Sequence, residues 1–438
     1  MLARCAHVGQ VQHSRILGLG ASMAAIRVGV IGAGRIMPAH LRGYAALRAA
    51  GYDDVRITAI CSRDPARAAR FVRGGGPSSA AEVGGPTSDP LFAPSIAVAD
   101  FQDDVEARVF TDVRDMLAAG VVDAVDITTE VSVHHTQALA CLEAGVHALV
   151  QKPFAISVRA ARKMMAAAQA RGLSLAVCEN ARFGRPARLG KWLVERGDLG
   201  TPQMVHATAL GTMWSPDKFV GNSAWRHRKL VGAGGASLDI GPHIFHRLRM
   251  LCGEVESVAA FARVFEPTRY LHDASGAAVD SVDCDADDAF MALASFESGA
   301  IGQLSFSFAG HGQPLAPSGL ILFGSRGSLN GDMVHLDGEA PMTLEEYVAR
   351  HGAADADRLY PLGMTDQFAL LLHSWLESIR TGTVAETGGE EGLRDLAASF
   401  AIVESSQAGR SVRFADVLDG SVDAYQREID EHYGLLPH

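Results

Sequence analysis

The sequence predicts two domains: a doubly wound α/β domain with a parallel sheet, followed by an α+β domain with an open, largely antiparallel sheet. Strand and helix patterns alternate from Ile26 to Val177, which is typical of parallel βαβ units. Beyond Cys178 several strand patterns follow one another, with helices on either side. We therefore expect a first domain over residues 23–178 and a second over residues 179–438.

The composition is that of a globular protein, with 48% hydrophobic and 20% charged residues. The net charge of −11 argues against binding along nucleic acid. No apolar run approaches the roughly 20 residues of a membrane-spanning helix. The six cysteines are scattered, so we expect reduced core residues in a cytoplasmic protein. Residues 1–22 lack the layout of a signal peptide and are expected to be a disordered extension.

The first strand pattern, Ile26–Ile31, leads into Gly32-Ala33-Gly34-Arg35-Ile36-Met37 and then a helical pattern over 38–50. Strand, glycine loop and helix in this order predict a Rossmann dinucleotide site. Gly32 would allow the tight turn, and Gly34 would let a pyrophosphate approach the backbone. The amides at the start of the helix, including Arg35 and Ile36, would face the negative charge. Met37 replaces the third glycine of the pattern, which suggests a slightly displaced helix.

The second strand pattern, Val55–Cys61, ends at Ser62 and Arg63 instead of the Asp or Glu that usually binds the ribose of NAD. A hydroxyl beside a guanidinium suits a 2′-phosphate. We therefore expect NADP in preference to NAD. In the alternative interpretation, Arg63 is a solvated loop residue. Asp64 is expected to cap the helix that starts at Pro65, and both interpretations can hold together.

A segment of about 74–108, rich in glycine and proline, interrupts the βα pattern and is expected to be a surface loop, with a lid as the alternative. The pattern then resumes with a helix at 112–119, a strand at 124–128, a helix at 131–144 and a strand at 147–150. Gln151-Lys152-Pro153 follows the last of these strands. Ligands bind at the carboxyl ends of strands in such sheets, so Lys152 is placed for chemistry. A helix at 158–171 and a strand at 173–177 complete the domain.

In the second domain, Gly234-Gly235 leads into a predicted helix over 237–252 that carries Asp239 and His243 and is interrupted early by Gly241-Pro242. Residues four apart share a helix face, and a carboxylate can orient an imidazole as a general base. The alternative is a solvated helix face. The other elements predicted here are helices at 188–195, 366–380 and 391–408 and strands at 203–211, 255–264, 288–296, 300–308, 320–323 and 328–330.

Three motifs follow one another along the chain: the glycine loop, Lys152-Pro153, and Gly-Gly-x-x-Leu-Asp-x-x-x-His at 234–243. From Ile26 to about Phe414 the chain resembles the glucose–fructose oxidoreductase/inositol dehydrogenase (Gfo/Idh/MocA) family of NAD(P)-dependent enzymes. The resemblance implies substrate binding where the two domains meet. It also implies that Lys152, Asp239 and His243 are catalytic and that the Lys152–Pro153 peptide is cis.

The resemblance extends to residues around this group. It places Thr128 and His134 near the cofactor and Trp225-Arg226 on the substrate side. Three positions depart from the family pattern: Glu130 replaces a proline, Gln151 a glutamate and His246 an aspartate. Further polar residues at predicted strand ends or in loops are candidates to line a polyol site; they are Glu179, Arg182, Arg226 and His311, together with Asp239 and His243.

The resulting hypothesis is an oxidoreductase that moves hydride between a nicotinamide cofactor and a secondary alcohol or ketone of a sugar, cyclitol or glycoside. His243 would act as base, Lys152 would polarise the reacting oxygen, and Asp239 would orient His243 or bind a sugar hydroxyl. The alternatives are a glycosidase that oxidises, eliminates and reduces with a retained cofactor, and a non-catalytic dinucleotide sensor.

Two further expectations concern metals and assembly. The acidic stretch 280–288 is expected to be a solvated loop, because it lacks the pattern of a calcium loop, and we expect no metal site. The resemblance also implies a homodimer or homotetramer formed through the exposed face of the second sheet.

Overall fold

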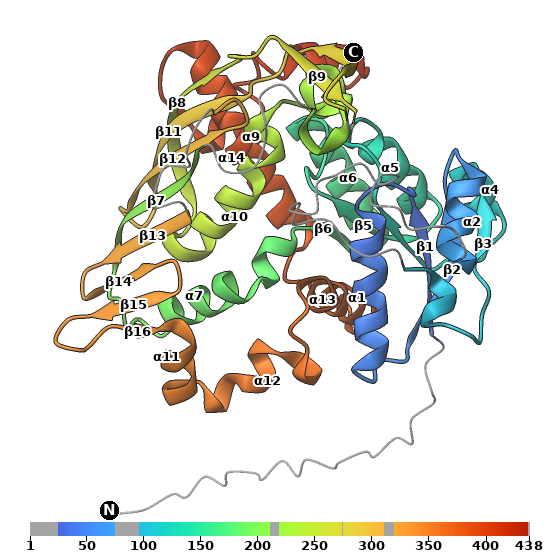
Figure 1. Cartoon of the computed structure of the whole chain (residues 1–438), viewed down its shortest axis with the longest axis horizontal. Coiled ribbons are helices and arrows are strands. Elements are labelled where there is room, and N and C mark those ends of the chain that lie inside the picture. Colours follow the sequence, from blue (N-terminus) through green and yellow to red (C-terminus); the bar gives the residue numbers. More distant parts are fainter. Residues whose placement is uncertain (1–24, 75–95, 211–218, 274, 311–318, 437–438) are drawn as a thin grey trace, which may run out of the picture.

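The computed structural model describes residues 25–74, 96–210, 219–273, 275–310 and 319–436. It contains two large sheets, with helices α10 (Gly241–Cys252) and α14 (Gly389–Ala408) between them (Figure 1). The predicted extension at 1–22, residues 75–95 of the predicted insertion, and His311 lie outside the described residues.

The first sheet has six parallel strands in the order β3-β2-β1-β4-β5-β6, which confirms the doubly wound domain. Its central strands are buried on both faces, as their continuous apolar runs predict. The strand order reverses between β1 and β4, so a crevice for ligands opens at their carboxyl ends. The strands are β1 (Ile26–Ile31), β2 (Val55–Cys61), β3 (Arg108–Phe110), β4 (Ala124–Ile127), β5 (His147–Gln151) and β6 (Leu175–Cys178).

Helices flank this sheet, and the second of them begins at the cap that the sequence predicts. Asp64 caps the second helix, its Oδ1 accepting a hydrogen bond from the Arg67 amide at 3.0 Å, with Pro65 at the first helical position. Met37, at the third glycine position of the fingerprint, is fully buried and starts the first helix. The helices are α1 (Met37–Ala49), α2 (Pro65–Arg73), α4 (Val113–Ala118), α5 (His134–Glu143) and α6 (Val158–Arg171).

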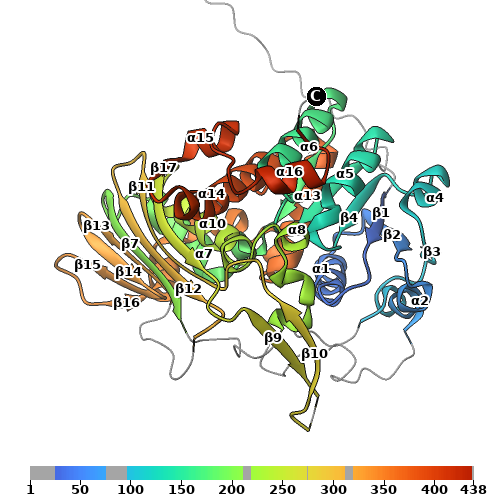
Figure 2. The same ribbon diagram turned by 90° about the horizontal axis from the view of Figure 1, so that it is seen from above.

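The second sheet has nine strands in the order β16-β15-β14-β13-β7-β12-β11-β8-β17. Its pairs are antiparallel except for β7 with β12, which confirms an open, largely antiparallel sheet. A separate two-stranded ribbon, β9 (Thr268–His272) and β10 (Ala278–Asp283), projects from the body of the molecule (Figure 2). The sheet strands are β7 (Pro202–Leu210), β8 (Val255–Arg263), β11 (Ala289–Phe296), β12 (Ile301–Ser307), β13 (Gly319–Gly324), β14 (Gly327–Asn330), β15 (Met333–Leu336), β16 (Met342–Thr343) and β17 (Val412–Arg413).

One face of this sheet is covered by α7 (Arg185–Glu195), α10 and α14, and the opposite face is open (Figure 2). The open face carries large apolar side chains, including Phe261 at 68% and Leu293 at 63% exposure. Such a contiguous apolar face is typical of a surface that another protein covers.

The interruption that the sequence predicts at Gly241-Pro242 is confirmed, because the segment over 237–252 forms two helices. The chain forms α9 (Ala236–Asp239), breaks at Ile240 and restarts as α10 with Pro242 in the first turn. Proline lacks the amide that would continue the preceding turn, and it favours a helix start. Asp239 and His243 therefore do not share one continuous helix face.

Helix α13 (Gln367–Thr381) follows the second sheet in sequence but packs against α1. Phe368 and Leu372 lie in the same apolar core as Val28 and Leu41. The core of the first domain therefore includes residues that lie far beyond residue 178 in the sequence. The remaining helices are α8 (Lys229–Gly232), α11 (Leu344–His351), α12 (Ala356–Leu359), α15 (Phe414–Asp419) and α16 (Arg427–His432), which the sequence patterns did not predict.

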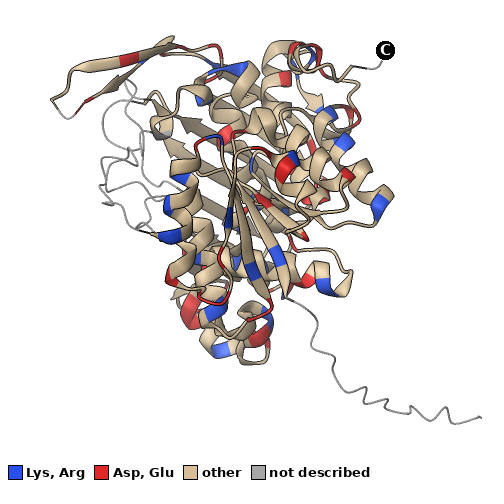
Figure 3. Cartoon of the chain, turned by 90° about the vertical axis from the view of Figure 1, so that its right-hand side faces the viewer, with Lys and Arg blue, Asp and Glu red and all other residues tan. Residues whose placement is uncertain are grey.

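Acidic and basic residues alternate over the side of the molecule seen in Figure 3. Within the described ranges, no helix is long and apolar enough to cross a membrane.

Candidate active site

The glycine loop lies at the carboxyl end of β1, beside Thr128. Gly32 has φ of +110°, and a Cβ there would lie 2.8 Å from the Thr128 hydroxyl oxygen. That hydroxyl donates to the Gly32 carbonyl at 3.1 Å. A Cβ on Gly34 would meet nothing within 4 Å, so the space above the loop is open. A tight turn and an open approach to the backbone fit a dinucleotide phosphate.

The neighbouring cofactor candidates lie around this loop. Ile36 is the N-cap of α1. Burial and the nearby Arg226 together lower the pKa of Arg35 to about 10. At the end of β2, the Ser62 amide donates to the Phe110 carbonyl at 2.9 Å, while the Arg63 side chain is exposed. Ser62 and Arg63 follow the end of β2, and their expected contact with the cofactor ribose stays a prediction.

Lys152 follows β5, and the Lys152–Pro153 peptide is cis, as the resemblance implies. Its Nζ donates to Asp239 Oδ1 at 2.8 Å and to the Asp239 main-chain oxygen at 2.6 Å. Asp239 also pairs with Arg226 at 3.3 Å, and the Arg226 guanidinium stacks 4.3 Å from the Trp225 ring centroid. Burial alone would raise the pKa of Asp239, but Lys152 and Arg226 hold it far below its usual range.

His243 is held by Glu179 and not by Asp239. Its Nδ1 donates to Glu179 Oε1 at 2.6 Å, and the Ala181 amide donates to the same oxygen at 2.9 Å. Burial would raise the pKa of Glu179, but His243 lowers it to about 2. The prediction that Asp239 orients His243 is corrected accordingly. The helix break at Ile240 separates the two residues, and Glu179 reaches His243 from the end of β6.

Glu179 has a second oxygen, Oε2, that is buried and has no hydrogen-bond partner within the described part of the chain. Buried carboxylate oxygens normally have partners. Oε2 is therefore a free acceptor beside His243.

His246 replaces the family aspartate and is fully buried behind His243. Its Nδ1 donates to Asp395 at 2.6 Å, and its Nε2 lies 3.3 Å from Arg182 Nη1. Burial would lower the pKa of His246, but Asp395 raises it. Arg182 also pairs with Glu386 at 3.3 Å. Arg182 thus joins the short helix that follows β6 to α10 and to the segment before α14.

His134 lies between two carbonyls. Its Nδ1 is 2.9 Å from the Pro153 oxygen and its Nε2 is 3.0 Å from the Thr129 oxygen. Burial lowers its pKa to about 4, so the ring is neutral and donates to one carbonyl at a time. His134 ties the loop after β4 to the Lys152–Pro153 turn; its expected contact with a cofactor stays a prediction. Glu130 is the N-cap residue of a short 3-10 helix that precedes α5.

A buried polar cluster behind Lys152 was not predicted. The Lys152 amide donates to Gln151 Oε1 at 2.8 Å, and Gln151 Nε2 lies 3.1 Å from His40 Nε2. His40 Nδ1 donates to Asp126 at 2.7 Å. Burial would lower the pKa of His40, but Asp126 raises it to about 10. The sequence contains one sign of this cluster, which is the charged residue Asp126 inside the otherwise apolar strand β4.

The acidic stretch is not a solvated loop throughout, which corrects that expectation. Asp287 is buried and accepts hydrogen bonds from the Gly235 amide at 3.1 Å and the Ser237 amide at 2.8 Å. A Cβ on Gly235 would overlap the Asp287 carbonyl oxygen. The absence of a side chain at Gly235 therefore makes room for the backbone of Asp287. Within the described ranges, no three His, Cys, Asp or Glu side chains gather as metal ligands.

The chain is similar to known proteins over both of its domains. The profile of an oxidoreductase family with an NAD-binding Rossmann fold matches residues 26–178, and that of the Gfo/Idh/MocA C-terminal domain matches residues 188–330. The chain is 26% identical over 304 residues to 1,5-anhydro-D-fructose reductase of Ensifer adhaerens, covering 69% of this chain and 82% of the relative. It is 24% identical over 317 residues to myo-inositol 2-dehydrogenase of Thermotoga maritima, covering 71% and 85%.

A solved levoglucosan dehydrogenase, in complex with NADH and L-sorbose, superposes with a TM-score of 0.69 at 22% identity, covering 90% of this chain and 99% of that one. That likeness supports the fold. The two family profiles and the named dehydrogenases and reductases also fix the class of chemistry, which is oxidation or reduction at CH–OH groups. The chain belongs to the Gfo/Idh/MocA family of NAD-binding oxidoreductases.

Proposed function

We propose that the protein is an NAD(P)-dependent dehydrogenase or reductase acting on a secondary alcohol or ketone of a sugar, cyclitol or related polyol. The observation that carries the proposal is the convergence of Lys152, Asp239, His243 and Glu179 beside the glycine loop. The substrate class is supported by relatives whose names state sugar and inositol substrates.

His243 is the proposed base. Glu179 holds Nδ1 as a donor, which leaves Nε2 to take the proton of the substrate hydroxyl. The His243 side chain is 26% exposed, so a ligand can reach it. The Glu179 carboxylate stabilises the imidazolium that forms, because its charge faces the ring across a single hydrogen bond.

Lys152 is the proposed electrophile for the reacting oxygen. An ammonium group has three donors, and two of them go to Asp239. The third is available to the substrate oxygen, where it stabilises developing alkoxide charge. Asp239 thereby positions Lys152, and its second oxygen holds Arg226.

The residues present fit a nicotinamide dinucleotide: the open space above Gly34, the amides at the start of α1, and the pair Ser62 and Arg63. When bound, this group supplies the acceptor for the hydride that leaves the carbinol carbon. Arg63 is exposed at the end of β2 and supports a preference for NADP. We further propose that copies of the chain associate through the open face of the second sheet.

The test replaces Lys152 with Met. NADPH and NADH binding, measured by fluorescence titration, should stay at the wild-type level, while turnover on a sugar or cyclitol substrate should fall by about 10²-fold or more. Near-normal turnover would remove Lys152 from the mechanism. Equal or tighter binding of NADH would contradict the preference for NADP.

A further inference from the structure

The accessible face of α10 carries a cation that the proposed chemistry does not use. Four side chains of α10 are not buried: His243, Ile244, Arg247 and Met250. Their spacing of three and four residues places them on one helix face. His243 and Arg247, one turn apart with Cβ atoms about 5–6 Å from each other, therefore face the same ligand space.

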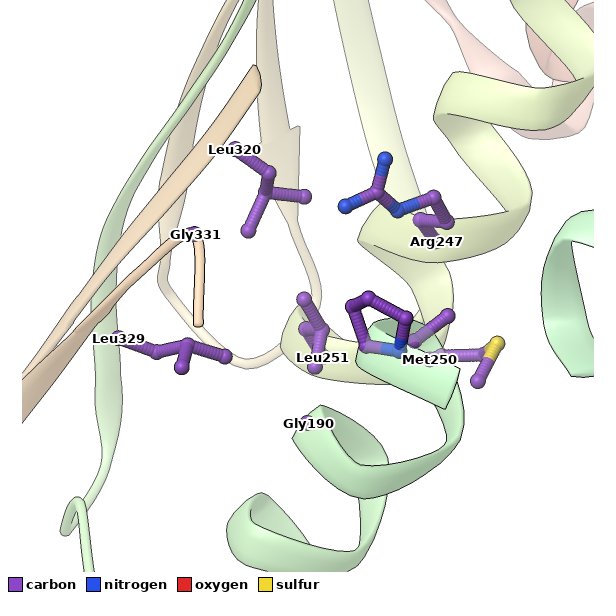
Figure 4. A pocket seen from close by; sticks show the side chains of 9 residues that line it. Gly190, Arg247, Met250, Leu251, Leu320, Leu329 and Gly331 are labelled. Carbon is purple, nitrogen blue, oxygen red and sulfur yellow. The ribbon is translucent and has the colours of Figure 1, made fainter. Parts of the chain in front are cut away.

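Arg247 has no counter-ion of its own. Within the described part of the chain, its guanidinium makes no hydrogen bond or ion pair, and Glu179 is the acidic group that influences it. Burial lowers the pKa of Arg247, which Glu179 only partly offsets. Figure 4 shows the side chain reaching over a small pocket toward Leu320 of β13, which lies with Leu329 of β14 on the sheet side of that pocket. A half-buried guanidinium among apolar walls is costly unless a ligand supplies the negative charge.

Nearby carboxylates cannot serve Arg247, because other groups already take them. Glu179 is engaged by His243. Each of two further carboxylates of the site is shared by two cations. The shared pairs are Asp239 with Lys152 and Arg226, and Glu386 with Arg182 and Arg188.

We propose that Arg247 binds an anionic group of the substrate, a carboxylate or a phosphate, so that the enzyme prefers an acidic sugar or cyclitol derivative to its neutral counterpart. The inference rests on the proposed function and adds the substrate class. A guanidinium offers two parallel N–H donors that match a carboxylate or phosphate, and a single hydroxyl cannot accept both.

The surroundings of Arg247 leave room for a larger anion. Met250, the next residue on the accessible face, also lines a second cavity of about 130 Å³. The wall of that cavity holds Arg188 and Lys191 together with their ion-pair partners Glu386 and Glu195. A substituent extending past Arg247 would therefore meet a wall of paired charges.

The test uses the full-length holoenzyme loaded with NADPH and measures binding of D-glucose, D-glucuronate and D-glucose 6-phosphate by calorimetry. We expect the wild type to bind at least one anion about tenfold or more tightly than D-glucose. Arg247→Leu should remove that advantage and leave D-glucose binding unchanged, while Arg247→Lys should retain part of it. Added salt should weaken anion binding in the wild type.

Arg350→Leu is the matched control, since Arg350 is an exposed arginine on α11. This variant should still bind the anionic sugar more tightly than D-glucose. If only D-glucuronate binds more tightly than D-glucose, the group bound by Arg247 is a carboxylate. If only D-glucose 6-phosphate does so, the group is a phosphate. If neither anion binds more tightly than D-glucose, or if Arg247→Leu weakens all three equally, the inference is overturned. This experiment measures binding and not turnover. Its result therefore does not depend on the outcome of the Lys152→Met test.

Discussion

Glu179 Oε1 and His243 Nδ1 lie 2.6 Å apart and join the end of β6 in the first domain to the start of α10 in the second. With the ionised carboxylate as acceptor, this bond holds Nδ1 of the proposed base as the donor and leaves Nε2 to take a proton.

Replacing Glu179 with Gln should lower kcat by about 10²-fold to 10⁴-fold, because the amide cannot stabilise an imidazolium and can select the wrong tautomer. The KM should change much less. Steady-state kinetics measure both, and Glu345→Gln, at an exposed glutamate of α11, is the matched control. A kcat within twofold of the wild type would exclude Glu179 from positioning His243.

Two glycine variants separate folding from cofactor binding. Gly32→Ala should destabilise the protein, because Gly32 has φ of +110° and its Cβ would press on Thr128. Gly34→Ala should fold with an unchanged melting temperature, because its Cβ meets nothing, but should bind NADPH more weakly. Thermal unfolding and fluorescence titration give the two readouts. Undiminished NADPH binding by Gly34→Ala would place the pyrophosphate elsewhere.

The His40–Asp126 pair predicts a pH-dependent stability. Asp126 raises the pKa of His40 to about 10, above the ordinary value of about 6.5. A raised pKa in the folded state gives stabilisation that is complete below about pH 6.5 and is lost as the pH rises toward 10. Asp126→Asn should cost about 3 kcal/mol at pH 6 and less at pH 9.5. Urea unfolding at both pH values measures the cost; a constant difference would refute the coupling.

The open face of the second sheet predicts self-association. Leu293→Asp, at a residue that is 63% exposed in the middle of β11, should convert the oligomer into monomers without lowering the melting temperature by more than a few degrees. Light scattering coupled to gel filtration gives the mass. Val384→Asp, at an 85% exposed residue away from this sheet, is the control. A wild-type protein that is already monomeric would reject the proposed interface.

The sequence by itself determined the elements whose signals are local. The glycine loop, the βα alternation, the Asp64 cap and the position of Lys152 after a parallel strand all follow from short-range periodicity and from the conformations open to glycine and proline. Arg247 was also within reach of sequence reasoning, because it follows His243 by four residues as His243 follows Asp239.

Only the tertiary structure decided which groups meet. Glu179 and His243 are 64 residues apart, and α13 enters the first core from the far end of the chain. The break at Ile240 turned a predicted Asp239–His243 pair into two separate contacts, and Gly235 proved to admit the Asp287 backbone. Charge pairing and close packing depend on distances across the fold, whereas periodicity reports only the face on which a side chain lies. For that reason the sequence named most members of the site, and the fold assigned their partners.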